Sequence, residues 1–178
     1  MSQRSIAAAL LAIILPVAGG SNLCAKPPTL TGFYPAGAER GRTVTATASG
    51  TFDHWPVKCW VEGAGLAVKA AEKTRELTFE VAADAQPGVR WVRLYDEEGA
   101  TSLRPFLVGA LPELMESEPN DDPRRPQVVD SPRVVVNGRL AKSGDVDGFA
   151  VKLDRGGALA ADLEADRHIG SPMDAVLQ

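Results

Sequence analysis

Hydrophobic and polar residues alternate over short stretches of this chain, and turn-forming residues separate the stretches. Between residues 57 and 62, for example, Val57, Cys59 and Val61 fall on one face and the residues between them on the other. A period of two is typical of a β-strand with one buried face. Alternation of this kind, or enrichment in β-branched and aromatic residues, predicts further strands at 43–48, 77–81, 89–95 and 103–108.

Specific turn signals lie between these stretches. Gln86-Pro87-Gly88-Val89 suits a type II turn, because proline presets φ and glycine supplies a positive φ. Asp96-Glu97-Glu98-Gly99 is typical of a hairpin connection. Pro105 lacks an N–H and places the strand at 103–108 at an edge or late in the sheet. Short strands at this spacing, with no helix-length pattern between them, predict an all-β fold with a small β-sandwich.

The first 25 residues have the layout of a secretory signal peptide. Arg4 provides a positive start, and Ile6–Leu15 is an apolar run followed by small residues. This run is too short to cross a bilayer core of about 30 Å as a helix. Cleavage after Gly20 or after Ala25 fits the small residues there. We therefore expect an exported protein, periplasmic, cell-surface or extracellular, with no stable membrane insertion after the signal peptide is removed.

The charge balance excludes one class of expected partner. The 19 Lys and Arg residues against 23 Asp and Glu residues give a net charge of −4. A nucleic-acid binder would need a basic face, so nucleic acid is not an expected partner.

Cys24 and Cys59 can form a disulfide if cleavage leaves Cys24 in place. The other interpretation, a buried structural thiol at Cys59, fits its position between Val57 and Val61.

The sequence indicates no active site. His54 and His168 are the only histidines, and the chain has no Gly-x-Ser-x-Gly elbow, no His-Glu-x-x-His pair and no phosphate-binding glycine loop. We therefore predict that these 178 residues are not an enzyme. A carbohydrate-binding face would need exposed aromatic residues; Trp60 alternates with Cys59, and we expect it to pack against a neighbouring strand rather than to be exposed.

A change of composition divides the chain. Residues 113–126 are acidic and rich in proline, which excludes a regular helix and is typical of a linker. After it, strands are expected at 134–137 and 149–153, with a further stretch at 158–163. The predicted organisation is a signal peptide at 1–25, a β-sandwich at 26–112, a linker at 113–126 and the start of a second β-sandwich at 127–178. Because the final apolar run at 176–178 has no turn after it, we expect a longer protein.

Two acidic motifs in the second part share a chemistry. One is Glu116-Ser117-Glu118-Pro119-Asn120-Asp121, and the other is Gly144-Asp145-Val146-Asp147-Gly148-Phe149. In an extended segment Glu116, Glu118 and Asn120 project from one face, and so do Asp145 and Asp147. Carboxylate and amide oxygens are the ligands that Ca²⁺ uses. The alternative interpretation, without a metal, is a pair of turns with solvated carboxylates. The sequence does not have the loop pattern of an EF-hand.

Two family resemblances rest on these stretches. Pro28 to Gly37, then Gly41 and the strand at 43–48, with Ala85-Gln86-Pro87-Gly88 later, resemble bacterial immunoglobulin-like domains of the IPT/TIG kind. From Glu116 onward, the order Glu-x-Glu-Pro-Asn-Asp, a valine-rich strand with Asn-Gly, then Gly-Asp-x-Asp-x-Phe and Gly-Gly resembles the first half of the bacterial pre-peptidase C-terminal (PPC) domain. Gly148 departs from that family, which usually has Tyr or another residue before the phenylalanine.

The resemblances imply two tandem β-sandwich modules, immunoglobulin-like or jelly-roll-like, with the second truncated. The PPC resemblance also implies calcium binding, and it nominates as ligands Glu116, Glu118, Asn120, Asp121, Asp145 and Asp147. The function expected is that of an exported, non-catalytic binding or accessory protein with a protein or polysaccharide ligand. The alternative is the N-terminal part of a secreted peptidase or other hydrolase whose catalytic domain lies downstream.

Overall fold

The structure is a computed structural model that describes residues 26–131, 133–171 and 173. The predicted signal peptide, Cys24 and the apolar run at 176–178 lie outside the described residues. Within the described part the protein is all-β, with twelve strands and one helix of four residues. No helix in that part is long and apolar enough to cross a membrane.

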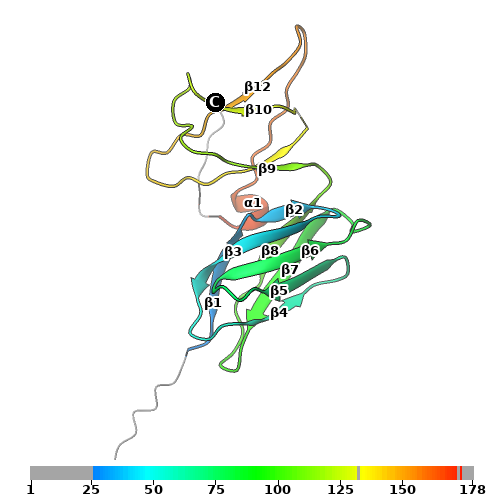
Figure 1. Ribbon diagram of the computed structural model, residues 1–178, viewed down its shortest axis with the longest axis vertical. Coiled ribbons are helices and arrows are strands. Elements are labelled where there is room, and N and C mark those ends of the chain that lie inside the picture. The colour runs from blue at the N-terminus through cyan, green and yellow to red at the C-terminus, as the bar shows by residue number, and fades with distance from the viewer. Residues whose placement is uncertain (1–25, 132, 172, 174–178) are drawn as a thin grey trace, which may run out of the picture.

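The first region consists of two four-stranded sheets that face each other (Figure 1). One sheet is antiparallel, in the order β1-β3-β6-β5, and its strands are Thr29–Tyr34 (β1), Thr43–Thr51 (β3), Glu76–Val81 (β6) and Leu66–Ala70 (β5). The other sheet has the order β2-β8-β7-β4, and its strands are Gly37–Glu39 (β2), Arg104–Gly109 (β8), Gly88–Tyr95 (β7) and Lys58–Val61 (β4). The β2–β8 pair is parallel.

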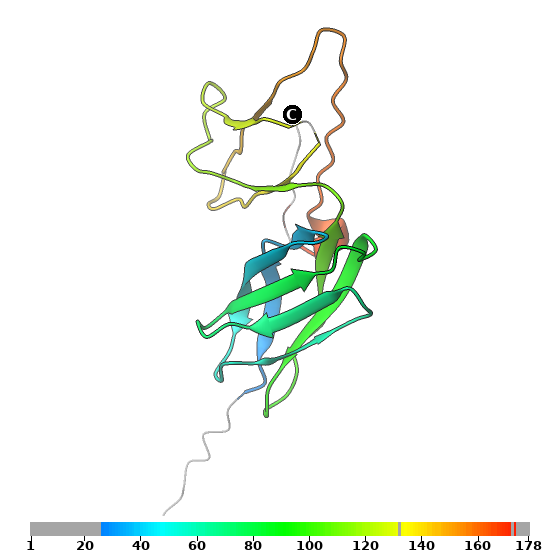
Figure 2. The ribbon, with the colours of Figure 1, turned by 45° about the vertical axis from the view of Figure 1, so that its right-hand side comes forward.

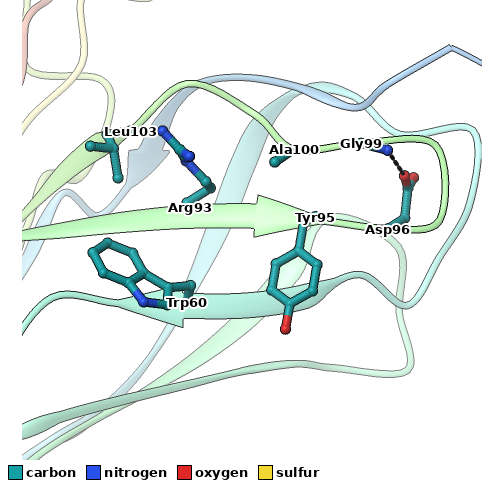
Figure 3. Close-up of a pocket in the computed structure, with 7 residues that line it drawn as sticks. All are labelled: Trp60, Arg93, Tyr95, Asp96, Gly99, Ala100 and Leu103. Carbon is teal, nitrogen blue, oxygen red and sulfur yellow. Dashed lines mark hydrogen bonds between the residues drawn. The ribbon is translucent and has the colours of Figure 1, made fainter.

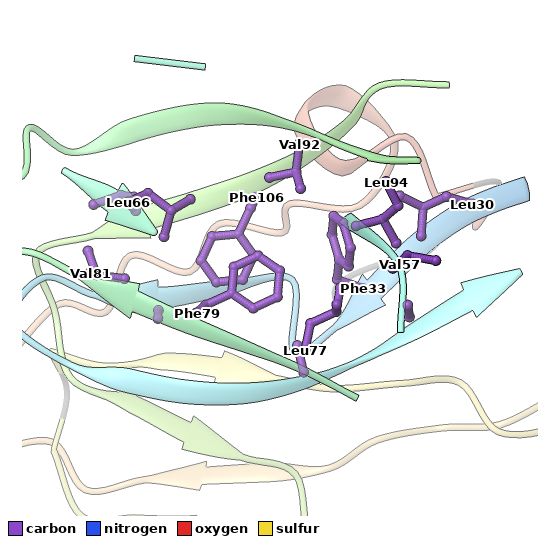
Figure 4. Packing of buried hydrophobic residues seen from close by; sticks show 14 of the residues in the cluster. Leu30, Phe33, Val57, Leu66, Leu77, Phe79, Val81, Val92, Leu94 and Phe106 are labelled. Atoms are coloured by element: carbon purple, nitrogen blue, oxygen red, sulfur yellow. The ribbon is translucent and has the colours of Figure 1, made fainter. Parts of the chain in front are cut away.

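A hydrophobic core lies between these two sheets (Figure 4). At its centre Phe79 of β6 stacks on Phe106 of β8, with ring centroids 4.0 Å apart, and Phe33 of β1 meets Phe79 edge to face. Leu77, Phe79, Val92, Leu94 and Phe106 are fully buried. Along β6 and β7 the buried residues alternate with less buried or exposed ones, so the sequence pattern gives these strands one buried face.

Close approach of β1 and β3 requires glycine at residue 50. Gly50 has φ of +153°, and a Cβ there would lie 2.0 Å from the carbonyl oxygen of Thr29. The pairing register also shifts between Leu30 and Gly32, which marks a β-bulge in β1. Gly50 therefore allows the end of β3 to pair with the start of β1.

The second region, residues 113–171, stacks at one end of the sandwich (Figures 1 and 2). It contains two parallel pairs of three-residue strands, β9 with β11 and β10 with β12. Their bounds, with the helix that lies against β8, are Glu113–Met115 (β9), Gln127–Val129 (β10), Val135–Asn137 (β11), Phe149–Val151 (β12) and Asp166–Ile169 (α1). The segment predicted as a linker thus begins with a strand that pairs inside the second region.

Most predicted strands are confirmed, with bounds that differ by up to three residues. The stretch at 158–163 is not a strand, and the structure has strands at Leu66–Ala70, Gly37–Glu39 and Gln127–Val129 that the pattern did not predict. Of the two positions predicted from Pro105, the edge position is wrong, because β8 lies between β7 and β2, whereas the late position is confirmed, because β8 is the last strand of the two facing sheets in chain order. However, β2 pairs only with residues 107–109 of β8, so the missing N–H of Pro105 leaves no strand partner unsatisfied.

Two side-chain expectations have clear outcomes. Cys59 is a free thiol packed against the core, and burial raises its pKa to about 11, as expected for a structural cysteine. Trp60 does not pack against a neighbouring strand as expected, because 48% of its side chain is exposed on the outer face of β4. His54 and His168 are both exposed.

Candidate metal centre

The two acidic motifs lie side by side in the second region. The first motif follows β9, whose pairing with β11 fixes its start: the Glu116 N–H donates to the Asn137 carbonyl over 2.9 Å. The second motif leads into β12, which pairs with β10. Gly148 joins the motifs directly, because its N–H donates to the Asn120 carbonyl over 3.0 Å.

Gly148 leaves little room for a side chain at this contact. A Cβ on Gly148 would lie 3.0 Å from the Asn120 carbonyl oxygen, and it would also meet Pro126 at 3.5 Å. The carbonyl of Gly148 in turn accepts from the Gln127 N–H at the start of β10. A side chain at residue 148 would require these neighbours to shift by a few tenths of an ångström, so glycine fits the contact between the two motifs.

The structure brings all six nominated residues into one cluster. Carboxylate oxygens of Glu116, Glu118 and Asp147 lie within 4.8 Å of one another, and so do oxygens of Glu118, Asp121 and Asp145. Glu118 belongs to both groups. The sixth residue, Asn120, donates from Nδ2 to Glu116 Oε1 over 3.4 Å, while its N–H donates to Glu118 Oε2 over 3.0 Å.

Buried oxygen atoms without a hydrogen-bond partner distinguish this cluster from an ordinary acidic surface. Asn120 is 1% exposed, and its Oδ1 accepts no hydrogen bond from the described residues. Asp147 Oδ1 is likewise buried and unpartnered. A buried acceptor left without a donor costs about 1–3 kcal/mol. Both residues adjoin Glu116, Asn120 through its Nδ2 and Asp147 through the carboxylate group that it shares with Glu116.

Burial and neighbouring carboxylates raise the pKa of Asp147. Burial is the main cause, and the neighbouring carboxylates of Glu116, Asp145 and Glu118 add to it, so that the pKa is about 6 instead of 3.8. The ionised form of Asp147 is therefore unfavourable in this protein without a compensating positive charge.

A lysine already compensates the second group. Lys142 Nζ lies 3.1 Å from Asp121 Oδ2 and 3.4 Å from Asp145 Oδ1. The pKa of Asp145 is lowered, first by a hydrogen bond from the Ala141 N–H and also by Lys142. The group formed by Glu116, Glu118 and Asp147 has no Lys or Arg ion pair within the described residues. Its negative charge is therefore the less compensated of the two groups.

The cluster also touches the first region. The Tyr34 hydroxyl donates to the Asn137 carbonyl over 3.1 Å, and the Arg139 guanidinium lies 4.7 Å from the centre of the Tyr34 ring. The Arg139 N–H donates to Glu116 Oε2 over 2.6 Å. Burial, and then the charge of Glu116, raise the pKa of Tyr34. The Asn137 carbonyl accepts from both the Tyr34 hydroxyl and the Glu116 N–H, and it therefore connects the acidic cluster to β1.

A second contact at the junction also involves β11. The Asn137 Nδ2 donates to Glu113 Oε2 over 2.8 Å, and burial raises the pKa of Glu113. Sequence analysis missed Tyr34, Asn137, Arg139 and Lys142, because their roles depend on long-range packing. The one available signal was the three-residue spacing of Lys142 and Asp145.

The ligand chemistry of the cluster favours a hard cation. All candidate atoms are oxygens, which suit Ca²⁺ and Mg²⁺ rather than Zn²⁺ or copper. Ca²⁺–oxygen distances of about 2.3–2.6 Å place ligands on opposite sides of the ion about 4.6–5.2 Å apart. All oxygens within each group lie within 4.8 Å of one another, an upper limit that admits Ca²⁺ as well as the smaller Mg²⁺.

Comparison with protein-family models, with curated proteins and with solved structures found no match to this chain.

Proposed function

We propose that this chain is an exported, non-catalytic binding or accessory protein, in which a calcium ion in the acidic cluster stiffens the second region and its junction with the first. The observation that carries the proposal is the pair of buried, unpartnered oxygens of Asn120 and Asp147 beside Glu116. In this proposal the chain joins an immunoglobulin-like sandwich to a PPC-like region. Two facing sheets support the first assignment, and the order of the acidic motifs supports the second.

Calcium would act on segments that little else holds together. The four strands of the second region are only three residues long, and its described part contributes Val129, Ala165 and Asn120 to the buried residues. An ion that binds oxygens from both acidic motifs would hold them against each other. Glu116 also accepts from the Arg139 N–H, and the Arg139 guanidinium lies over the Tyr34 ring of the first region. An ion bound to Glu116 would therefore restrain the junction between the two regions as well.

Thermal unfolding with and without calcium tests the proposal. Calcium sites of extracellular modules have dissociation constants of about 10⁻⁴–10⁻³ M. In about 10 mM calcium, mass action then stabilises the folded state by about 1.4–2.7 kcal/mol. At about 2–4 °C per kcal/mol for a chain of this size, Tm should rise by about 3–10 °C relative to protein in EGTA.

Substitution locates the effect. Glu118→Gln should remove most of the calcium-dependent rise, because Glu118 belongs to both carboxylate groups. Glu72→Gln is the matched control: Glu72 is exposed and lies on the first region, so its calcium response should equal that of the wild type. An unchanged Tm in millimolar calcium, or an equal rise in Glu118→Gln, would contradict the metal site.

Export is tested separately. The chain is expressed with residues 1–25 in a bacterial host, and the periplasmic fraction is analysed by intact mass. We expect a product that has lost 20 or 25 residues, which matches cleavage after Gly20 or Ala25. Full-length protein that stays in the cytoplasm would refute export.

A further inference from the structure

The outward face of the β2-β8-β7-β4 sheet carries exposed aromatic side chains. Along β7, Trp91, Arg93 and Tyr95 point outward, and the residues between them are buried. Trp60 of β4 lies opposite Arg93 in the strand register. The exposed fractions are 48% for Trp60, 40% for Trp91 and 37% for Tyr95.

The other sheet shows that aromatic exposure is a property of this one face. The outward positions of β3 are Thr43, Thr45 and Thr47, all exposed. Of the aromatic residues in that sheet, Phe33 and Phe79 point into the core and are buried, and Tyr34 is partly buried beneath the Arg139 guanidinium. Two of the three tryptophans of the protein thus lie on the outer face of one sheet, where they add nothing to the core.

A shallow pocket of about 480 Å³ lies on this aromatic face (Figure 3). Trp60, Tyr95 and Leu103 supply its apolar surfaces, and the hairpin after β7 closes one end with Gly99. Its size is in the range of small-ligand sites, about 300–1,000 Å³. A standard protein interface instead takes about 20–30 residues from each partner, many more than the aromatic residues present here.

The pocket also offers hydrogen-bond donors. Arg93 makes no hydrogen bond or ion pair with the described residues, so its guanidinium donors are available. The Asp96 carboxylate supports the hairpin instead: Oδ1 accepts from the Glu98 N–H over 2.9 Å and from the Gly99 N–H over 3.2 Å, the latter drawn in Figure 3, and Oδ2 is buried. Arg93 and Asp96 are the only charged residues in the lining, so the pocket has no net charge.

We propose that this pocket binds a neutral glycan. Pyranose rings combine apolar C–H faces, which stack on aromatic rings, with hydroxyl groups that both donate and accept hydrogen bonds. Trp60 and Tyr95 provide the stacking surfaces, Arg93 provides donors and the charge balance matches an uncharged ligand. This inference rests on the binding role proposed above and names the class of its ligand, but it does not depend on calcium.

Affinity electrophoresis in gels that contain a soluble polysaccharide tests the proposal. The full chain, recovered after export, is run against xyloglucan, galactomannan and mixed-linkage β-glucan as neutral probes and against alginate as an anionic probe. Sedimentation with cellulose and chitin extends the neutral set. All runs are made in calcium and in EGTA, and the calcium response in thermal unfolding is measured on the same samples.

At least one neutral polysaccharide should retard the wild type. Trp60→Ala should weaken that binding roughly three- to tenfold, the effect of losing one aromatic contact. Trp60→Phe should keep most of the affinity, and Thr45→Ala, on the opposite sheet, should bind like the wild type. Because Trp60 is exposed, its truncation leaves the core intact, and an unchanged Tm of the variant verifies this.

Three results would overturn the assignment. They are retardation by no neutral polysaccharide, retardation by alginate alone, and equal binding by wild type and Trp60→Ala. Self-association that Trp60→Ala abolishes would also overturn it, because the face would then belong to a second copy of the chain. Glycan binding that persists in EGTA together with a missing calcium response would refute the calcium proposal only.

Discussion

Replacing Asp147 by asparagine should stabilise the calcium-free protein. In the folded chain the pKa of Asp147 is about 6 instead of 3.8, because of burial and the carboxylates of Glu116, Asp145 and Glu118. A folded-state pKa above the unfolded value means that ionisation destabilises the folded state. This penalty is fully present above about pH 6 and disappears below about pH 4.

The expected magnitude follows from the same values. A shift of roughly two pH units corresponds to about 3 kcal/mol, and solvent screening at this partly exposed side chain reduces it to about 1–2 kcal/mol. Asp147→Asn in EGTA at pH 7.5 should therefore raise Tm by about 2–8 °C. At pH 4 the gain should vanish. In calcium the order should reverse, because the variant loses a ligand that the wild type has.

Asp145→Asn is the matched control with the opposite sign. The pKa of Asp145 is lowered by the Ala141 N–H and by Lys142, so its charge stabilises the folded state. Its removal should lower Tm in EGTA at pH 7.5. Differential scanning calorimetry at pH 4 and 7.5 measures both variants. An unchanged or lowered Tm in Asp147→Asn at pH 7.5, or a gain that persists at pH 4, would refute the like-charge explanation.

Two further predictions concern the core and the junction. Phe79→Ala removes a fully buried ring that contacts Phe33 and Phe106 and should lower the free energy of unfolding by about 3–5 kcal/mol in urea titrations; a loss below about 1 kcal/mol would contradict its central place in the core. Tyr34→Phe deletes the hydrogen bond to the Asn137 carbonyl, so limited proteolysis should cut residues 113–140 faster while the first region stays intact; equal cleavage rates would show that this bond does not hold the junction.

The sequence predicted those strands that have one buried face and one exposed face. Residues 77–81 alternate clearly and residues 89–95 are rich in β-branched and aromatic residues, and both are strands of the sandwich. Leu66–Ala70 was missed, because Ala67 and Ala70 weaken the contrast between its two faces. The interior position of β8 was missed for another reason: its neighbour β2 comes from residues far away in the chain, and local patterning carries no information about that pairing.

The acidic cluster was predicted more completely than the sheet order. Period-two spacing within each motif, together with a family resemblance, was enough to name all six oxygen-bearing residues that the structure brings together. Their interactions could not be predicted in the same way. Lys142 neutralises Asp121 and Asp145, whereas no lysine or arginine in the described part of the chain pairs with Asp147, and this difference arises only when the two motifs fold against each other.

The short strands at the two edges of the β2-β8-β7-β4 sheet have a consequence for solubility. Long, flat, apolar edge strands act as templates for intermolecular β-pairing and aggregation. Here β2 has three residues and β4 has four, and the exposed Lys58 starts the β4 edge. The sheet can thus present Trp60 and Trp91 to solvent while it offers another chain little backbone to pair with. The face proposed to bind a ligand therefore does not promote intermolecular strand pairing.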